Sequence, residues 1–290
     1  MFEDPRTRGP RPPFPASRPG NDSHLDPKPD YGEDTYTGHR RLEGCGAIVI
    51  GGDSGIGRAV AIAFAREGAD VLIAFQTEEA EATETSRWIA KAGRRAVLAG
   101  GEFESQRRQT EIVEQAMAAF GRLDVVVNDA VAGYAHESQH ESSALGVEEG
   151  LRKRTEAVFA FSKIAAARMK AGASIITTTA VHSSHPPAQQ RGYAAFQGGV
   201  ASLTASLAQE LGHQGIRVNA VQPGPVWAPR LVRALTEEQR RNFGAETMLG
   251  RPGQPVEFAP AYVFLASADA SFVTGSVLYV TGGRFDRLQP

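Results

Sequence analysis

A glycine-rich turn between a predicted strand and a predicted helix constrains the fold of this chain more than any other feature. The apolar run over residues 47–50 predicts a buried strand, and the apolar spacing from Ile56 to Phe64 predicts a helix that ends near Gly68. Glycines allow the backbone to approach a pyrophosphate closely, and the helix N-terminus attracts its charge. The stretch therefore predicts half of a dinucleotide site, with these candidate ligands: Gly51, Asp53, Ser54, Gly55, Ile56 and Gly57.

Apolar segments with strand and helix character alternate along the rest of the chain. We expect strands at 70–75, 95–99, 123–128, 174–179, 217–222 and 277–280, and helices at 79–91, 109–120, 147–170, 193–213 and 256–268. Such alternation predicts an α/β fold, a single Rossmann-type, doubly wound parallel sheet of about seven strands with helices on both faces. Ligands of such sheets bind at the carboxyl ends of the strands.

The first 30 residues contain eight prolines, which exclude a helix or a central strand there. We expect an extended or disordered arm over residues 1–42, followed by one Rossmann-type domain over residues 43–290. Two interpretations of the arm stay open. It is either a loose tail or a segment that wraps a neighbouring subunit, with Tyr31 and Tyr36 as its anchors.

Composition excludes several classes of protein. The 290 residues carry a formal net charge of −2, which offers no electrostatic basis for binding nucleic acid or an anionic membrane. A single cysteine, Cys45, fits a reducing compartment. The chain has no apolar run of ~18 residues and no hydrophobic signal core. We therefore expect a cytoplasmic protein with a small-molecule substrate, and the scattered histidines predict no metal site.

Several motifs in order along the chain resemble those of the short-chain dehydrogenase/reductase family. They are Gly51-Gly52-Asp53-Ser54-Gly55-Ile56-Gly57, Leu123-Asp124-Val125-Val126-Val127-Asn128, Tyr193, Gly215-Ile216-Arg217-Val218-Asn219-Ala220-Val221, Pro223-Gly224-Pro225, Gly250-Arg251-Pro252-Gly253, Phe264-Leu265-Ala266-Ser267 and Val273-Thr274-Gly275. The resemblance covers residues 43–283. In the arm, Pro29-Asp30-Tyr31-Gly32-Glu33 and Tyr36-Thr37-Gly38 resemble the subgroup with a proline-rich N-terminal extension.

The resemblance implies hydride transfer between a nicotinamide nucleotide and a small carbonyl compound or alcohol. A tyrosine is the family's general acid and base, and a lysine four residues later lowers its pKa from ~10. A serine binds the substrate oxygen, and an asparagine on the preceding long helix holds a water. Here Tyr193 fills the tyrosine position, but the other three positions hold Gln197, Ala180 and Arg154.

Each replacement has two interpretations. Thr179, Ser183 or Ser184 replaces the hydroxyl missing at Ala180, or nothing does. Arg154 supplies the cation that Gln197 lacks, so that one charge has been relocated, or it is a solvated arginine. His182, or His185, is a second acid and base near neutral pH, or an ordinary loop histidine.

The same resemblance assigns the remaining cofactor contacts. They are Glu102, Phe103, Asn128, Ala130, Gln197, Pro223, Gly224 and Val226. The end of the second strand, Ala74-Phe75-Gln76-Thr77, carries neither the acid typical of NAD binding nor a base typical of NADP binding. Arg58, at the start of the first helix, favours NADP. Residues 226–249 are expected to form the substrate lid.

Two functions follow from these residues. The first is an NAD(P)-dependent oxidoreductase with a depleted tetrad and weak carbonyl reductase activity. The alternative is a redox-inactive member of the same fold, or one that catalyses an isomerisation or cyclisation with Tyr193 and His182. We also expect a homo-oligomer, a tetramer, in which small residues of the two long helices approach another subunit: Ala157, Ala165, Ala166, Ala201, Ala205 and Ala208.

Overall fold

The structure is a computed structural model that describes residue 25 and residues 27–103, 105–129, 144–180, 191–232 and 235–284. For residues 144–154, 191–194 and 230–231 it describes the backbone alone. Seven parallel strands form one sheet in the order β3-β2-β1-β4-β5-β6-β7. They are β1 (Gly46–Ile50), β2 (Asp70–Phe75), β3 (Ala96–Gly100), β4 (Val125–Asn128), β5 (Ser174–Thr178), β6 (Arg217–Pro223) and β7 (Val277–Val280). The predicted doubly wound sheet is confirmed.

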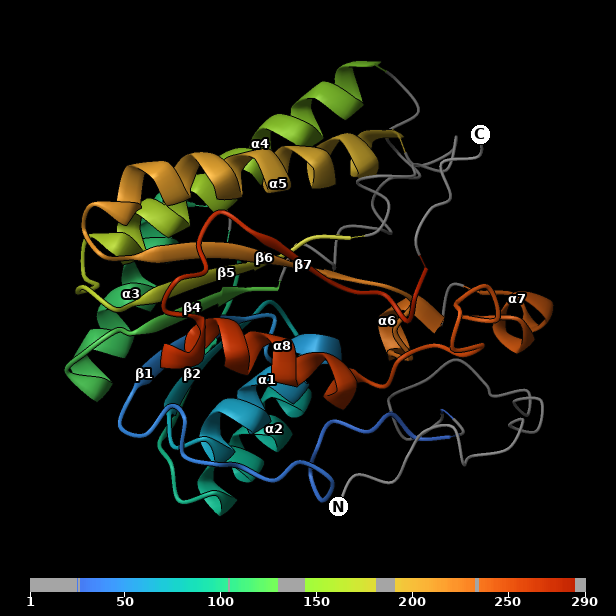
Figure 1. Ribbon diagram of the computed structural model, residues 1–290, viewed down its shortest axis with the longest axis horizontal. Helices are drawn as coiled ribbons and strands as arrows, with labels where there is room; N and C mark the ends of the chain where they lie inside the picture. The colour runs from blue at the N-terminus through green and yellow to red at the C-terminus, as the bar shows by residue number, and fades with distance from the viewer. Residues whose placement is uncertain are drawn as a thin grey trace.

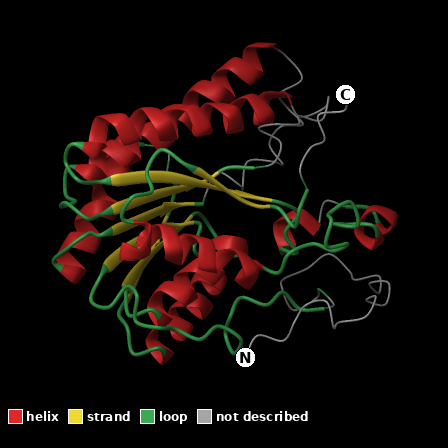
Figure 2. Ribbon diagram, in the orientation of Figure 1, coloured by secondary structure: helices red, strands yellow, loops and turns green. Residues whose placement is uncertain are grey.

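Helices cover both faces of the sheet, α4 and α5 on one face and α1, α2 and α8 on the other (Figures 1 and 2). Helix α3 packs against α4. The helices are α1 (Gly55–Arg66), α2 (Glu79–Lys91), α3 (Gln106–Phe120), α4 (Ala144–Ala166), α5 (Arg191–Gly212), α6 (Pro229–Val232), α7 (Glu237–Arg241) and α8 (Pro255–Ala266), with a 3-10 helix at Ala268–Ala270.

The alternation of side chains along each strand divides the core into two clusters. In β1, Ala47 and Val49 lie in a cluster with α1 and α8, whereas Ile48 and Ile50 lie in a cluster with α3, α4 and α5. All four side chains are buried. A continuous apolar run in the sequence therefore corresponds to a strand covered on both faces, as parallel sheets require.

The structure differs from the expected elements mainly at helix ends and in the segment after β6. Helix α3 begins at Gln106, a turn earlier than expected, because the Ser105 side chain accepts a hydrogen bond from Arg108 N–H and caps it. The expected lid holds two short helices, α6 and α7. Thr236 and Gln239 form a reciprocal capping box at α7. Helices of four or five residues leave too little periodicity for a prediction.

The residues before β1 that the structure describes pack against the rest of the same chain. We call residues 27–44 the N-terminal strap. Within it Tyr31 is 0% exposed, and Tyr36 and Leu42 are buried in the same cluster as α1 and α8. Gly38 lies so close to α1 that an added Cβ would meet the Arg66 carbonyl oxygen at 1.9 Å. Tyr31 and Tyr36 are therefore anchors within the subunit, and not on a neighbouring one.

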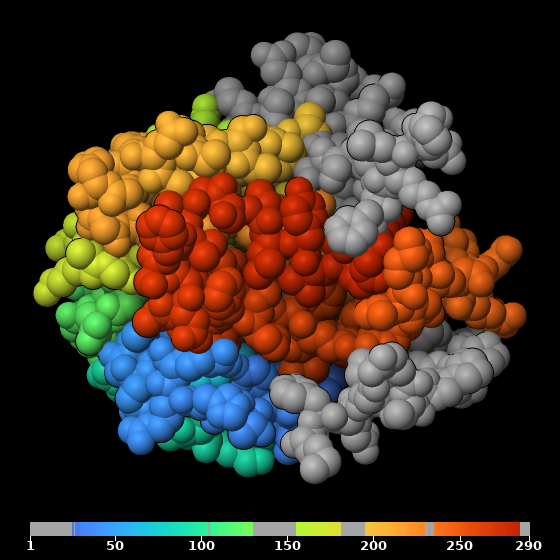
Figure 3. Space-filling model, in the orientation of Figure 1, coloured from blue at the N-terminus to red at the C-terminus, as the bar shows by residue number. Residues whose placement is uncertain are grey.

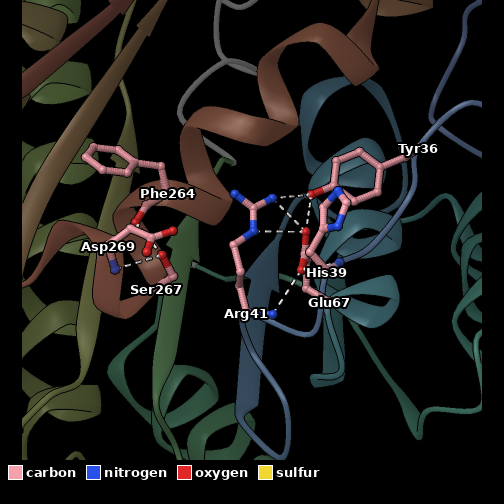
Figure 4. A network of polar contacts seen from close by, with 7 residues as sticks. All are labelled: Tyr36, His39, Arg41, Glu67, Phe264, Ser267 and Asp269. Carbon is pink, nitrogen blue, oxygen red and sulfur yellow. Dashed lines mark hydrogen bonds and ion pairs between the residues drawn. The ribbon is translucent and has the colours of Figure 1, made fainter. Parts of the chain in front are cut away.

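A buried carboxylate holds the C-terminal half of the strap (Figure 4). Glu67, at the end of α1, accepts hydrogen bonds from Tyr36 Oη at 2.6 Å, from Arg41 Nη2 at 2.7 Å and from His39 N–H at 2.9 Å. Burial alone would raise the pKa of Glu67, but the hydrogen bonds from Arg41 and Tyr36 lower it to about 2. Burial and the Glu67 carboxylate raise the pKa of Tyr36. This network joins the strap to α1.

Most of the alanines expected at a subunit interface face their own subunit instead. Ala165, Ala166 and Ala208 lie in the core cluster beneath α4 and α5, and Ala157 is also buried. Ala201 is half-buried, and of the six only Ala205 is exposed. The small residues therefore serve the packing of α4 on α5 within one chain.

Candidate nucleotide site

The candidate site lies where the carboxyl ends of β1 and β4 meet. These strands are neighbours in the sheet, with Ile50 opposite Asn128, although β2 and β3 separate them in sequence. From this pair of strands, β1 is followed by β2 on one side within the sheet, and β4 is followed by β5 on the other side. Such a switch in strand order leaves a crevice at the carboxyl edge, which is where doubly wound sheets bind their ligands.

The glycine turn after β1 has the geometry that its sequence predicts. Gly51 and Gly55 have φ values of +79° and +55°, which residues with a side chain rarely adopt. A Cβ on Gly57 would lie 2.2 Å from the Gly51 carbonyl oxygen, so only glycine allows α1 to begin this close to β1. The turn brings the start of α1 to the crevice.

The other members of this turn contribute backbone more than side chains. Ile56 is buried in the core, and Asp53 is also buried. Ser54 precedes α1 with extended backbone, and its hydroxyl does not cap the helix. The first N–H groups of α1 are therefore directed at the crevice without a side-chain cap from Ser54.

Asp129 ties the end of β4 to the start of α1. Its Oδ2 accepts a hydrogen bond from Gly57 N–H at 2.9 Å, and its own N–H donates to the Ile50 carbonyl oxygen at 3.1 Å. Burial and the charge of Asp129 raise the pKa of Tyr262 well above its ordinary value. Sequence reasoning did not assign Asp129 to the site. Its place directly after Asn128, at the switch point, was the available signal.

Two predicted cofactor residues have buried amides without hydrogen-bond partners. Asn128 is 1% exposed and Gln197 is 0% exposed. Among the described residues they are the two whose side-chain nitrogen and oxygen both lack a partner. A buried polar group without a partner costs ~1–3 kcal/mol, which a ligand with hydroxyl or amide groups would offset. These residues fit a nucleotide, because ribose hydroxyls supply donors and acceptors.

The two predicted cofactor residues after β3 are one exposed and one buried side chain. Glu102 is exposed after β3. Phe103 is buried, and its ring meets the Phe161 ring edge to face with centroids 4.9 Å apart. The Phe103 ring therefore belongs to the core, and only its backbone is left for a ligand.

The turn after β6 packs tightly against β7 and the start of α8. Gly224 N–H donates to the Val280 carbonyl oxygen at 2.9 Å, and an added Cβ would lie 2.8 Å from the Thr281 carbonyl oxygen. Val226 is buried and pairs with Gly253 in an isolated bridge. Pro223, the last residue of β6, is also buried. This segment forms a second wall beside the carboxyl edge of the sheet.

Arg58 does not support the predicted preference for NADP. It is 5% exposed, with its guanidinium 4.5 Å from the centroid of the Tyr31 ring and 3.5 Å from the Glu33 carboxylate. The side chain thus contacts the N-terminal strap, and its charge is engaged there. A phosphate contact from Arg58 was expected because the residue follows the glycine turn. Its guanidinium instead contacts Tyr31 and Glu33 of the strap.

The predicted catalytic residues are described only in part. Tyr193 and Arg154 lie on α5 and α4, where the structure describes their backbone alone. His182 and Ala130 lie outside the described residues, as do Ser183, Ser184 and His185. Thr179, which was expected as one substitute for the missing serine, is buried and donates its hydroxyl to the Gln197 carbonyl oxygen at 3.3 Å.

Neither a membrane-spanning helix nor a metal-ligand cluster is found in the part of the chain that the structure describes. No helix among the described residues has the length and apolarity needed to cross a membrane. Within the same residues no three histidine, cysteine, aspartate or glutamate side chains gather closely enough to hold a metal ion.

Comparison with known proteins places this geometry in a family. The family described as "Enoyl-(Acyl carrier protein) reductase" matches residues 50–284. An uncharacterized oxidoreductase of Bacillus subtilis, YhdF, is 39% identical over 282 residues, covering 97% of this chain and 98% of that protein. The NADPH-dependent aldehyde reductase 1 of Arabidopsis thaliana is 35% identical over 92% of this chain and 95% of that protein.

Solved structures agree in fold and extent. A short chain dehydrogenase from Burkholderia cenocepacia in complex with NADP superposes with a TM-score of 0.76 at 28% identity, covering 84% of this chain and 98% of that chain. A short-chain dehydrogenase/reductase mutant from Serratia marcescens also gives a TM-score of 0.76, at 29% identity. With its glycine turn, its switch point and these relatives, the chain belongs to the short-chain dehydrogenase/reductase family.

Proposed function

We propose that this protein is an NAD(P)-dependent oxidoreductase that slowly interconverts a small carbonyl compound and its alcohol. The observation that carries the proposal is the pair of buried, unpartnered amides, Asn128 at the end of β4 and Gln197 on α5, together with a turn whose geometry requires glycine. Both amides lie at positions that the family resemblance assigns to the nucleotide. Its oxidoreductase relatives, among them a glucose and ribitol dehydrogenase of Daucus carota that is 36% identical, support the reaction class.

Each part of the site has a separate task in this proposal. The N–H groups at the start of α1 bind the pyrophosphate, and Gln197 binds ribose hydroxyls with its amide. When bound, the nucleotide supplies or accepts the hydride. Tyr193 donates its phenolic proton to the carbonyl oxygen during reduction and recovers it from the alcohol during oxidation.

Slow turnover follows from the residues around Tyr193. Gln197 has no charge, so it does not stabilise the phenolate as a lysine would. Ala180 offers no hydroxyl to the substrate oxygen. The Thr179 hydroxyl, which donates to the Gln197 carbonyl oxygen, is directed to the backbone of α5 and not to a substrate.

NADP is the form that we propose, on the strength of relatives and not of Arg58. The B. cenocepacia structure contains NADP, and the A. thaliana relative is NADPH-dependent by name. At the end of β2, Gln76 and Thr77 are exposed, and Thr77 donates a hydrogen bond to Glu78 at 3.0 Å. Separate titrations with NADPH and NADH decide between the two forms.

Transfer of deuterium from labelled NADPH tests the proposed reaction. The full chain is incubated with NADPH carrying deuterium on the nicotinamide and with a panel of small aldehydes and ketones, and mass spectrometry measures deuterium in the alcohol products. We expect slow, enzyme-dependent labelling, which Tyr193→Phe abolishes without weakening NADPH binding.

The alternative function gives a different result in the same experiment. A redox-inactive protein yields no labelled alcohol from any substrate, even where NADPH binds. An isomerase or cyclase converts its substrate without consuming the nucleotide. Labelling that persists in Tyr193→Phe would remove Tyr193 from the proposal.

A further inference from the structure

The N-terminal strap reaches both elements that we propose to hold the nucleotide. At α1 it contributes Tyr31 and Glu33, which enclose the Arg58 guanidinium directly after Gly57. On the surface of the molecule the described N-terminal part of the chain, drawn in blue, lies directly against the orange-red segment around α8 (Figure 3). The strap therefore contacts the first turn of α1 through Arg58.

The beginning of the strap contacts the segment after β6. The indole N–H of Trp227 donates to the Pro27 carbonyl oxygen at 2.8 Å, across 200 residues of sequence. Leu25, just ahead of the strap, forms a small apolar cluster with Trp227 and Val232. The Phe243 ring packs against this cluster, with its centroid 6.4 Å from that of Trp227.

The start of α8 joins these two contacts. Asp30 N–H donates to Gln254 Oε1 at 3.0 Å, and the Asp30 carbonyl oxygen accepts from Val256 N–H at 3.0 Å. Trp227 N–H donates to the Gly253 carbonyl oxygen at 2.8 Å. Strap, α8 and the segment that carries Trp227 thus form one hydrogen-bonded unit beside the crevice.

The segment after β6 depends on such contacts for its position. Helix α6 has four residues, Pro229–Val232, and a helix of this length does not form without tertiary contacts. Trp227 is 1% exposed, and the side chains that bury it include Leu25 from the N-terminal chain. Without the contacts to Trp227, the residues after Gly224 would become ordered only when the nucleotide binds. The cost of that ordering would lower the affinity for the nucleotide.

We propose that Leu25, Pro27 and Trp227 are positioning residues of the nucleotide site, which fix residues 223–232 relative to the glycine turn. This inference rests on the proposed function, because it assumes that residues 223–226 contact the nucleotide. Leu25 and the N-terminal strap are then part of the binding apparatus and not only stabilising additions.

Two matched pairs of variants test the inference in the full chain. Trp227→Phe removes the hydrogen bond to Pro27. Tyr36→Phe removes two hydrogen bonds, one to Glu67 and one from Arg41, in the C-terminal half of the strap. Leu25→Ala truncates the contact with Trp227, and Leu42→Ala truncates a buried leucine far along the strap. Calorimetry gives the Kd of each variant for NADPH, and thermal unfolding gives its Tm.

We expect Trp227→Phe and Leu25→Ala to weaken NADPH binding about three- to tenfold, as the loss of one hydrogen bond or a few methylene contacts allows. Tyr36→Phe and Leu42→Ala should lower the Tm while the Kd for NADPH stays within twofold of wild type. A Kd for NADPH that is unchanged in Trp227→Phe and Leu25→Ala, or one that follows the Tm in all four variants, would overturn the inference.

Tryptophan fluorescence separates this inference from the proposed function. In the background of Trp88→Phe, Trp227 is the only tryptophan. Leu25→Ala should then make Trp227 more accessible to acrylamide without any nucleotide, and an unchanged accessibility would show that Leu25 does not hold Trp227. Failure of the wild-type protein to bind NADPH and NADH would overturn the proposed function, and with it this inference, whatever the quenching shows.

Discussion

The carboxylate of Asp129 accepts a hydrogen bond from the N–H of Gly57 at 2.9 Å, and so places a negative charge at the N-terminus of α1. Such a charge stabilises a helix through its dipole. It also lies at the end of the helix that we propose to bind a pyrophosphate.

Asp129→Asn should therefore change nucleotide affinity and stability in opposite directions. We expect NADPH to bind about fivefold more tightly, because a like charge near the phosphates is removed, at a cost of ~0.3–1 kcal/mol in helix stability. Calorimetry and thermal unfolding measure the two effects. Weaker NADPH binding by this variant would show that the carboxylate assists the site.

A combined reversal of three replacements tests the charge-relocation hypothesis. If Arg154 takes over the task of the missing lysine, Gln197→Lys alone should help little, because two cations would then repel each other. Ala180→Ser, Gln197→Lys and Arg154→Asn together should raise carbonyl reductase activity by about a hundredfold or more, which is the contribution of one positioned acid–base group.

Arg154→Asn alone separates the two interpretations of that residue. Under relocation it should abolish the activity of the native chain, whereas a solvated arginine can be replaced without effect. Initial rates with NADPH and a small aldehyde measure both changes, and Tyr193→Phe added to the triple variant is the control.

The Glu67 network predicts how stability depends on acid. Because the pKa of Glu67 falls from its ordinary 4.5 to about 2 on folding, the unfolded chain binds this proton first. The stabilisation is therefore complete above pH 4.5 and is lost as the pH falls toward 2. It amounts to about 3 kcal/mol. Urea unfolding of wild type and Glu67→Gln between pH 2 and 7 measures it, and parallel pH profiles for the two proteins would contradict the assignment.

The expected tetramer stays a prediction, now with different residues behind it. In the described part of the chain β7 is an edge strand, and Phe272 and Tyr279 near it are 103% and 55% exposed. Exposed aromatic side chains at a sheet edge favour association. Sedimentation should give a tetramer at micromolar concentration, and Phe272→Asp with Tyr279→Lys a smaller species. A monomeric mass for the native chain would contradict the prediction.

The fold was predictable because its signals are local and agree with one another. Each strand is an apolar run between turn residues, and the glycines at 51, 55 and 57 mark a tight turn that a side chain at these positions would strain. The order of the strands follows from the alternation of elements and the handedness of crossovers. Element ends were less predictable, as the Ser105 cap on α3 shows.

The functions of individual side chains were less predictable, because they depend on contacts between distant segments. Arg58 follows the glycine turn, yet its partners Tyr31 and Glu33 come from the strap. Trp227 lies in the segment 226–249 that was expected to form the substrate lid, and it packs against Leu25, about 200 residues away. The spacing of apolar residues along the sequence does not indicate contacts between such distant segments.

The titration of the protein with NADPH tests the central claim most directly, with Gly57→Ala as its counterpart. Calorimetry should show one nucleotide bound per chain for the wild-type protein. It should show none for Gly57→Ala, in which the added methyl carbon would lie 2.2 Å from the Gly51 carbonyl oxygen. Gly212→Ala, where a Cβ meets nothing within 4 Å, should bind as wild type does. Absence of binding by the wild-type chain with NADPH and with NADH, or equal binding by Gly57→Ala, would contradict a nucleotide site at this turn.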